Sequence, residues 1–292
     1  MSNREGNENQ NFLECGRFSL SLSRPLVMGI LNLTPDSFSD GGNYTKVDDA
    51  ICLAESMVNH GVDIIDVGAE STRPGSQDVS DAVEWDRLKH VLPSLVGLKV
   101  PVSIDTRKPI VMSRALDCGV DMLNDVSGFR SVEALQVAKN CINSKVAFCI
   151  MHMQGNPSNM QDSPRYLDVV AEVQHFLKTR YECLISIGVG KKNIVVDPGF
   201  GFGKTSNHNL DLLMQLKKFK EIAPVLVGIS RKRIIAEMSE SNSLPVDRLG
   251  GSIAAAIWSV LNGASIVRVH DVKETVEALR VFQRMDESLS NN

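Results

Sequence analysis

Short apolar runs rich in β-branched residues alternate along the chain with longer stretches whose apolar residues recur at helical spacing. Between the first two runs, Leu53, Met57 and Val58 share one helical face, and Gly61 follows as a helix C-cap. The repeat averages about 35 residues, which is the length of one βα unit. The eight predicted strands are residues 26–32, 63–70, 100–106, 121–127, 145–152, 193–199, 223–230 and 264–271.

Eight βα units predict a single α/β domain, a (β/α)₈ TIM barrel. An open, doubly wound parallel sheet is the alternative that the same pattern allows. The barrel is expected over residues 17–286, between a flexible N-terminal tail of residues 1–16 and a C-terminal tail of residues 287–292.

Composition and charge narrow the classes of partner. The formal net charge of -4 gives no reason to expect nucleic acid or an anionic membrane as a partner. The six cysteines include no C-x-x-C pair, which indicates reduced thiols instead of a disulfide framework or a zinc site. The polar N-terminus does not resemble a signal peptide, and the longest apolar run, residues 253–261, is far shorter than the roughly 18 residues of a membrane helix. We therefore expect a soluble, cytoplasmic protein.

Polar groups that are costly to bury without a partner follow nearly every predicted strand on its C-terminal side. In a barrel these strand ends converge on one face, where the active site of this fold lies. Any one of them could be a satisfied cap, but the eight strand ends together indicate a functional site. The residues are Asn32, Glu70, Ser71, Thr72, Asp105, Asn124, Asp125, His152, Asp197, Ser230, Arg231, Lys232, Arg268 and His270.

Two carboxylates and an amide in this set suit a flat heterocycle. Asp105 and Asp197, when ionised, each accept two parallel N–H bonds, which matches an amino group beside a ring N–H. The amide of Asn124 can donate to a ring nitrogen and accept from a ring N–H. Together they match the 2-amino-4-oxo-pyrimidine edge of a guanine or a pterin. For each residue alone, a structural cap on its strand end is the alternative.

The glycine-rich segment "DPGFGFGKT", residues 197–205, resembles a phosphate-binding loop only superficially. A Walker A motif requires Gly where Pro198 stands, and the glycine spacing does not fit G-x-G-x-x-G. We interpret the segment as a flexible loop after the sixth strand, whose glycines allow a flat ligand to approach closely.

Five basic residues follow the seventh and eighth strands, at the corner where this fold commonly binds phosphate. They are Arg231, Lys232, Arg233, Arg268 and His270. Such a cluster can bind a diphosphate and, with a metal ion, stabilise it as it departs. A solvated run of charges is the alternative, which suits Arg233 better than Arg268, because Arg268 lies between two valines. The histidines at positions 60, 90, 152, 175 and 208 lack metal-ligand spacing and are interpreted as surface or cap residues.

Polar, turn-rich segments follow the first two strands. The first offers the amide of Asn32, the carboxylate of Asp36 and the ring of Phe38, but no nucleophile held by a base. The second offers the hydroxyl of Thr72 and the positive charge of Arg73, which suits a carboxylate. Such loops can close over a ligand, although an arginine that is merely solvated is the alternative for Arg73.

Taken together, eight blocks of the sequence resemble the signature blocks of the dihydropteroate synthase family. They occur in order between residue 27 and about residue 272. The blocks are "ILNLTPDSFSDGG", "GAESTRPG", "SIDT", "LNDVSG", "MHMQGNP", "DPGFGFGKT", "GISRK" and "RVHDV". The resemblance implies a TIM barrel, usually a homodimer. Such an enzyme condenses (7,8-dihydropterin-6-yl)methyl diphosphate with 4-aminobenzoate and releases diphosphate, which Mg²⁺ accompanies.

The resemblance also implies a role for each matching residue. The implied pterin contacts are Thr72, Asp105, Asn124, Asp197 and Lys232. The implied diphosphate anchors are Arg268 and His270, with Asn32 at the magnesium ion and the diphosphate. The implied aminobenzoate pocket contains Arg73, Pro74, Phe202 and Ser230, and Phe38 is the aromatic residue of the first loop.

The chemistry of this family explains a loop without a nucleophile. If diphosphate leaves before the weak aromatic amine attacks, the pterin ring can delocalise the positive charge on the methylene carbon. Catalysis then requires a stabilised leaving group and the exclusion of water. We hypothesise that Asp36 supplies negative charge near the cation while its loop folds over the substrate. The residues expected to act in catalysis are Asp36, Lys232, Arg268 and His270.

Two other functions would fit part of this pattern. A pterin-binding methyltransferase of the same barrel type would share the pterin contacts but would not need a diphosphate corner. A non-enzymatic paralogue that binds a pterin or serves as a scaffold for a partner is the other alternative; loss of Asp197 or Lys232 would indicate it, and both residues are present. Because the aminobenzoate pocket carries the residues of the family, we also expect sulfonamides to compete for it.

Overall fold

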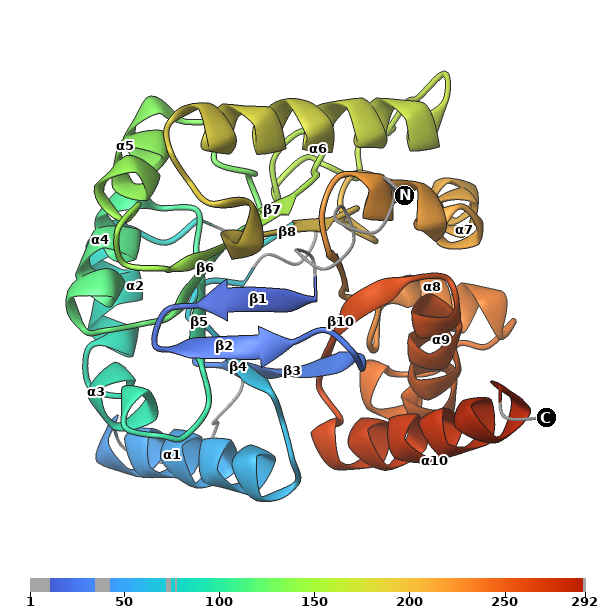
Figure 1. Ribbon diagram of the computed structural model, residues 1–292, viewed down its shortest axis with the longest axis horizontal. Coiled ribbons are helices and arrows are strands. Elements are labelled where there is room, and N and C mark those ends of the chain that lie inside the picture. Colours follow the sequence, from blue (N-terminus) through green and yellow to red (C-terminus); the bar gives the residue numbers. More distant parts are fainter. Residues whose placement is uncertain (1–10, 35–42, 72–74, 77, 291–292) are drawn as a thin grey trace, which may run out of the picture.

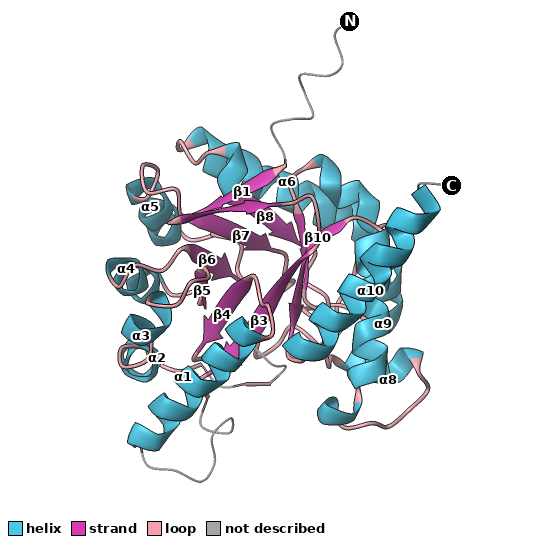
Figure 2. Ribbon diagram, turned by 60° about the horizontal axis from the view of Figure 1, so that its bottom comes forward, coloured by secondary structure: helices cyan, strands magenta, loops and turns pink. Residues whose placement is uncertain are grey.

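Eight parallel strands close into a barrel that is surrounded by helices (Figures 1 and 2). The structure is a computed structural model that describes residues 11–34, 43–71, 75–76 and 78–290. Around the barrel the strand order is β10-β3-β4-β5-β6-β7-β8-β9, and all of these pairs are parallel. The closed sheet confirms the predicted TIM barrel and excludes the open, doubly wound sheet.

The barrel strands coincide with the eight predicted runs. Their bounds are β3 (Leu26–Asn32), β4 (Ile64–Gly68), β5 (Val102–Asp105), β6 (Met122–Asp125), β7 (Ala147–Met151), β8 (Ile194–Asp197), β9 (Val225–Val227) and β10 (Ala264–Val269).

Ten α-helices and three short 3₁₀ helices lie in the described part of the chain. The α-helices are α1 (Asn43–Asn59), α2 (Asp81–Leu88), α3 (Leu92–Val96), α4 (Pro109–Asp117), α5 (Val132–Asn140), α6 (Val169–Ser186), α7 (Ser206–Met214), α8 (Arg233–Met238), α9 (Leu249–Leu261) and α10 (Val272–Ser290). The 3₁₀ helices are η3 (Lys191–Asn193), η4 (Leu216–Glu221) and η5 (Pro245–Asp247). No helix in these ranges is both long enough and apolar enough to span a membrane.

Polar side chains determine where several helices begin. Ser80, Ser131 and Asp168 accept hydrogen bonds from backbone N–H groups in the first turns of α2, α5 and α6. At the start of α7, Thr205 and His208 cap each other reciprocally. His208 is therefore a cap residue, which is one of the two roles predicted for it.

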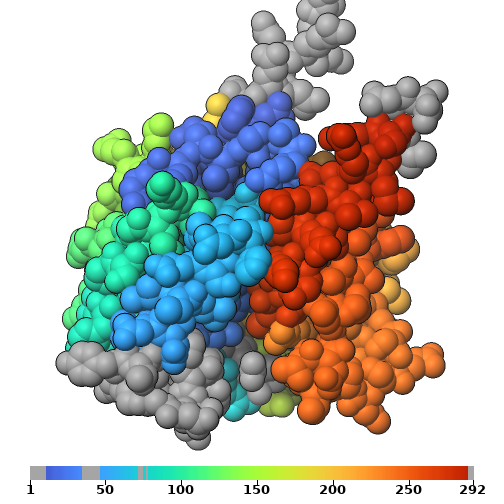
Figure 3. Space-filling model, turned by 90° about the horizontal axis from the view of Figure 1, so that it is seen from below, coloured from blue at the N-terminus to red at the C-terminus, as the bar shows by residue number. Residues whose placement is uncertain are grey.

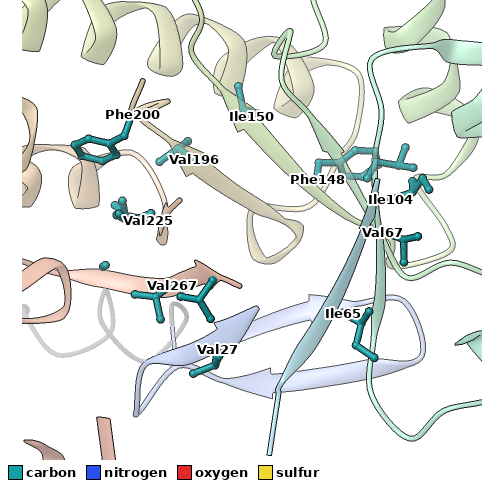
Figure 4. Close-up of a cluster of buried hydrophobic side chains, with 14 of the residues drawn as sticks. Val27, Ile65, Val67, Ile104, Phe148, Ile150, Val196, Phe200, Val225 and Val267 are labelled. Carbon is teal, nitrogen blue, oxygen red and sulfur yellow. The ribbon is translucent and has the colours of Figure 1, made fainter. Parts of the chain in front are cut away.

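The core has two layers, because alternate residues of each strand point to opposite faces of the sheet. Residues such as Val27, Ile65 and Val267 pack outward against the helices, in the cluster shown in Figure 4. Their neighbours Met28 and Ile266 belong to a second cluster, which lines the barrel interior.

An antiparallel hairpin closes the N-terminal end of the barrel. Strands β1 (Phe12–Cys15) and β2 (Phe18–Ser21) pair with each other, and Leu13 and Cys15 belong to the interior cluster. The hairpin is fixed to the starts of β6 and β7: Arg17 forms an ion pair with Asp121 at 2.8 Å, and the Gly16 N–H donates to the Lys145 carbonyl at 2.8 Å.

The structure corrects both predicted tails. The N-terminal tail of residues 1–16 was expected to be flexible, but residues 12–15 form a strand because alternating apolar side chains plug the barrel. The C-terminal tail of residues 287–292 was expected to lie outside the domain, but α10 continues to Ser290. The remaining positions of these tails, 1–10 and 291–292, lie outside the described residues.

The packing of the β1–β2 hairpin into the barrel leads to a prediction about the free energy of unfolding. Leu13→Ala should lower the free energy of unfolding by about 2–5 kcal/mol, because it leaves a cavity at a fully buried position. The matched control is Phe12→Ala in the same strand, where the side chain is 46% exposed and the loss should stay below about 1 kcal/mol. Urea unfolding measures both values, and equal losses would show that the hairpin does not plug the barrel.

Candidate active site

Inside the barrel, an apolar layer changes to a polar one toward the C-terminal ends of the strands. Ile64, Met122, Val195 and Ile266 belong to the interior cluster. Two residues further along the same strands are Asp66, Asn124, Asp197 and Arg268, which therefore point into the barrel as well. On β5, Asp105 occupies the equivalent level. The alternation of the strands thus assembles one polar layer from five strands.

Arg268 contacts two carboxylates of this layer, and one of them also binds Asn124. Its Nε donates to Asp66 Oδ2 at 2.6 Å, and its Nη2 donates to Asp105 Oδ2 at 2.7 Å. Asp66 Oδ2 also accepts a hydrogen bond from Asn124 Nδ2 at 3.1 Å. Burial lowers the pKa of Arg268, but the carboxylates of Asp66 and Asp105 outweigh it and raise that pKa above its ordinary value. The guanidinium therefore remains charged.

Asp105 has an oxygen to offer to a ligand. Burial raises the pKa of Asp105 to about 7, although the nearby charge of Arg268 acts to lower it. Within the described part of the chain, Asp105 Oδ1 is buried without a hydrogen-bond partner. A buried acceptor without a partner costs about 1–3 kcal/mol, which a ligand N–H donor would recover.

Asp197 and Lys232 lie close enough for each to shift the pKa of the other. Burial raises the pKa of Asp197, and the charge of Lys232 opposes this shift. Burial also lowers the pKa of Lys232 to about 8, although Asp197 acts to raise it. The Lys232 ammonium donates to the Phe200 carbonyl at 2.5 Å and lies 4.5 Å from the centre of the Phe202 ring. The predicted residues Asp197, Phe202 and Lys232 therefore come together.

Ser230 and His270 are neighbours at the ends of β9 and β10. Ser230 Oγ lies 3.2 Å from His270 Nδ1 and accepts a hydrogen bond from the His270 N–H at 3.2 Å. This hydroxyl therefore orients the imidazole.

The corner of five basic residues is smaller than predicted. Arg231 Nε donates to Asp271 at 3.0 Å, so its charge is neutralised beside the corner. Arg233 is 75% exposed and pairs with Glu237 on the surface of α8, which is the solvated alternative. Arg268 lies among the carboxylates inside the barrel, so Lys232 and His270 are its basic neighbours from that set.

The segment of residues 197–205 follows β8 as predicted, but the structure shows a firmly held loop in place of a flexible one. The ammonium of Lys204 is buried and donates to the carbonyls of Gly199 and Phe202 at 2.9 and 3.0 Å. Gln161 and Tyr166 donate to the carbonyls of Gly201 and Gly203 at 2.6 and 2.8 Å. Gly199 is required because a Cβ there would lie 1.9 Å from the His152 carbonyl oxygen.

His152 is also corrected, because it is neither a surface nor a cap residue. Its ring is buried, and Nδ1 lies 3.0 Å from the Lys204 ammonium. Burial, together with the charge of Lys204, lowers the pKa of His152 to about 2. The ring is therefore neutral, and Nδ1 accepts the hydrogen bond from Lys204.

Sequence reasoning missed two residues of the site, Asp66 and Lys204. A charged residue inside the apolar run "IIDVG" was a detectable signal for Asp66. Lys204 lies in the segment of residues 197–205, in which only the proline and the glycines were considered.

Several predicted residues lie outside the described part of the chain. These are Asp36, Phe38, Thr72, Arg73 and Pro74. The strand ends from which their loops leave are described. Asn32 ends β3 on one side of Gly68 of β4, and Asp105 ends β5 on the other side.

Comparison with known proteins identifies the family. Residues 28–270 match the family described as pterin binding enzyme. The chain is 44% identical to the dihydropteroate synthase of Neisseria meningitidis serogroup B, over 93% of this chain and 96% of that protein. The chain belongs to the dihydropteroate synthase family.

Solved structures of dihydropteroate synthases share its architecture. The enzyme from Xanthomonas albilineans with 4-aminobenzoic acid is 42% identical, with a TM-score of 0.88 over 95% of this chain and 98% of that one. The same enzyme in complex with 7,8-dihydropteroate is 40% identical, with a TM-score of 0.85 over 94% of this chain and 98% of that one. The resemblance drawn from the sequence blocks is confirmed.

In this member of the dihydropteroate synthase family, the role of Lys204 can be tested. Lys204→Met should lower the free energy of unfolding by about 1–3 kcal/mol, because it leaves two buried carbonyls and His152 Nδ1 without their donor. Lys217→Met, on the exposed surface of η4, is the matched control and should change it little. Urea unfolding compares the two variants. Equal stability of Lys204→Met and wild type would mean that the ammonium does not hold the loop.

Proposed function

We propose that this protein is a dihydropteroate synthase of folate biosynthesis. It condenses (7,8-dihydropterin-6-yl)methyl diphosphate with 4-aminobenzoate and yields 7,8-dihydropteroate and diphosphate. The observation that carries the proposal is the polar layer inside the barrel, where carboxylates and an amide lie beside Arg268 and Lys232. Relatives with the same fold have been solved with 4-aminobenzoic acid and with 7,8-dihydropteroate.

The pterin ring binds to the layer through its aminopyrimidinone edge. Asp105 Oδ1 and the carboxylate of Asp197 accept from the exocyclic amino group and the ring N–H groups. Asn124 and Lys232 supply the remaining polar contacts, and Thr72 adds a contact from its loop. These assignments agree with the burial of the layer, because a buried polar group needs a partner.

The diphosphate group binds at the C-terminal ends of β10 and β3, which are paired strands; Asn32 ends β3, Arg268 lies in β10 and His270 directly follows β10. Mg²⁺ prefers oxygen ligands and commonly takes only one or two of them from the protein, with substrate phosphates and waters completing the octahedron. The amide oxygen of Asn32 fits this pattern. When bound there, the ion would neutralise charge on the departing diphosphate.

Carbon–oxygen cleavage precedes attack by the amine. Arg268 and His270 stabilise the diphosphate as it departs, and the pterin ring delocalises the charge left on its methylene carbon. The aminobenzoate then attacks from a pocket that contains Arg73, Pro74, Phe202 and Ser230. Phe202 is already held against Lys232, and Ser230 contacts His270, so both lie beside the diphosphate corner. Asp36 and Phe38 act from the first loop, Asp36 through its negative charge.

A homodimer is part of the proposal. Helices α8, α9 and α10 cover one side of the molecule in orange and red in Figure 3. On α9, Ala254, Trp258 and Leu261 share an exposed face, and Leu244 and Val246 before the helix are 65% and 63% exposed. Clustered apolar side chains at the surface are a feature of protein–protein interfaces.

The activity assay mixes the chain with the pterin diphosphate, 4-aminobenzoate and Mg²⁺, and follows diphosphate and dihydropteroate. We expect equal amounts of both products. Asp197→Ala should weaken pterin binding about tenfold or more, because it removes a charge-assisted partner worth about 1.5–3 kcal/mol. Asp211→Ala, on the exposed side of α7, is the control and should retain full activity. Methyl transfer to a thiol or corrinoid in place of diphosphate release would establish the methyltransferase function instead.

The pKa values of Asp105 and Lys232 predict the pH dependence of kcat/KM. Below pH 7 the raised pKa of about 7 leaves Asp105 protonated, so it accepts fewer ring N–H bonds and kcat/KM falls. Above pH 8 Lys232, with its pKa lowered to about 8, loses its charge and kcat/KM falls again. The profile measured between pH 5 and 10 should be a narrow bell. An acid limb near pH 4, typical of an ordinary carboxyl group, would contradict the assignment of Asp105.

A further inference from the structure

Asp66 is a charged residue in the middle of a buried strand, and the reaction described above does not use it. It is fully buried, and its strand neighbours Ile65 and Val67 pack outward against the helices. The side chain of Asp66 therefore points into the barrel, at the level of Asn124 and Arg268.

One oxygen of Asp66 makes all of its side-chain contacts. Oδ2 accepts from Asn124 Nδ2 at 3.1 Å and from Arg268 Nε at 2.6 Å. The second oxygen, Oδ1, is buried without a hydrogen-bond partner in the described part of the chain. Asp66 thus joins a residue proposed to contact the pterin with a residue proposed to anchor the diphosphate.

Stability does not explain this carboxylate. A buried charge loses its hydration, and an oxygen without a partner adds to that cost. Replacing a buried ion pair with apolar residues of similar size is often neutral or stabilising. Arg268 would keep Asp105 as a partner without Asp66, so the fold does not need Asp66 to neutralise the guanidinium.

The orientation that Asp66 imposes on Asn124 and Arg268 does explain its carboxylate. An ionised carboxylate can only accept hydrogen bonds, so the amide group of Asn124 that faces Asp66 must be the NH₂ group. The amide oxygen of Asn124 is then held on the opposite side. In the same way, the contact at Nε fixes the plane of the Arg268 guanidinium and leaves its two terminal nitrogens for other groups, one of which reaches Asp105.

We propose that Asp66 is a positioning residue of the active site: it sets which face of the Asn124 amide meets the pterin ring and fixes the plane of the Arg268 guanidinium. Asp66 acts through these two residues and does not touch substrate. The inference rests on the proposed function, because it assumes that the polar layer binds a pterin diphosphate.

Two substitutions separate positioning from packing. Asp66→Leu keeps the size of the side chain but removes every acceptor, whereas Asp66→Asn retains one acceptor oxygen and removes the charge. We expect Asp66→Leu to bind 6-hydroxymethyl-7,8-dihydropterin, which lacks the diphosphate, about tenfold more weakly than wild type, or about 1.4 kcal/mol. Asp66→Asn should lose less, because it can still hold Asn124 in part of its population. Isothermal titration calorimetry measures these affinities.

A double-mutant cycle tests whether the effect passes through Asn124. In an Asn124→Ala background, Asp66→Leu should change the affinity for the bare pterin by less than about twofold, because there is no longer an amide to orient. Full additivity of the two losses would overturn the proposal.

The affinity for inorganic diphosphate with Mg²⁺ tests the part of the proposal that concerns Arg268. Loss of a negative charge by itself would strengthen the binding of an anion. Misplacement of Arg268 predicts the opposite, and we expect Asp66→Leu to bind diphosphate several-fold more weakly. Stronger binding of diphosphate would overturn the part of the proposal that concerns Arg268.

The control is Asp121→Asn, which alters another buried aspartate at the opposite end of the barrel. It should leave the affinity for the bare pterin within about twofold of wild type. If Asp66→Leu does not fold, the comparison of Asp66→Asn with Asp121→Asn decides, and equal affinities would overturn the proposal. A wild-type chain that binds neither pterin nor diphosphate would instead reject the proposed function, so the two failures are distinguishable.

Discussion

The structure depends on keeping several charged side chains out of water inside one barrel. Asp66, Asp105 and Asp197 lie in one layer with Arg268, which contacts the first two, and the charges of Lys232 and Lys204 act on the third. Burial favours the neutral form of these side chains: the pKa of Asp105 rises to about 7, and that of Lys232 falls to about 8. A layer of this kind favours a ligand that brings N–H donors to the carboxylates. It also favours a positive charge that develops on such a ligand, which is what departure of diphosphate from the pterin methylene produces.

The rest of the fold holds this layer in place and keeps water from reaching it from below. The β1–β2 hairpin fills the N-terminal end of the barrel with Leu13 and Cys15, beneath the polar layer. On the other side, Lys204 fixes the loop after β8, which presents Phe202 to Lys232. Both devices stabilise a rigid scaffold around groups that must stay within hydrogen-bond distance of a flat ring.

The barrel and much of its site could be predicted from the sequence, because strand length, helical spacing and strand-end polarity are local signals. Asp105, Asn124, Asp197 and Arg268 were found because each stands at or near the end of an apolar run. The hairpin was missed because two four-residue strands have little periodicity, and their burial depends on a barrel end that forms far along the chain.

The residues whose roles were predicted wrongly have one physical cause in common: a partner distant in sequence determines whether a charged side chain is buried or neutralised. Arg231 was predicted at the diphosphate corner, but Asp271, forty positions later, neutralises it. Lys204 becomes buried because His152 and the loop carbonyls surround its ammonium.

Arg268 also connects the recognition of the two ends of the substrate. Its guanidinium contacts Asp66 and Asp105, so the group proposed to anchor diphosphate is bound to a group proposed to accept from the pterin ring. Ring N–H groups can bind Asp105 Oδ1 while Oδ2 keeps its contact with Arg268 Nη2, because the two oxygens of a carboxylate accept hydrogen bonds separately. The groups proposed to hold the ring and the diphosphate are therefore fixed relative to each other by hydrogen bonds, which favours a defined geometry when the diphosphate departs.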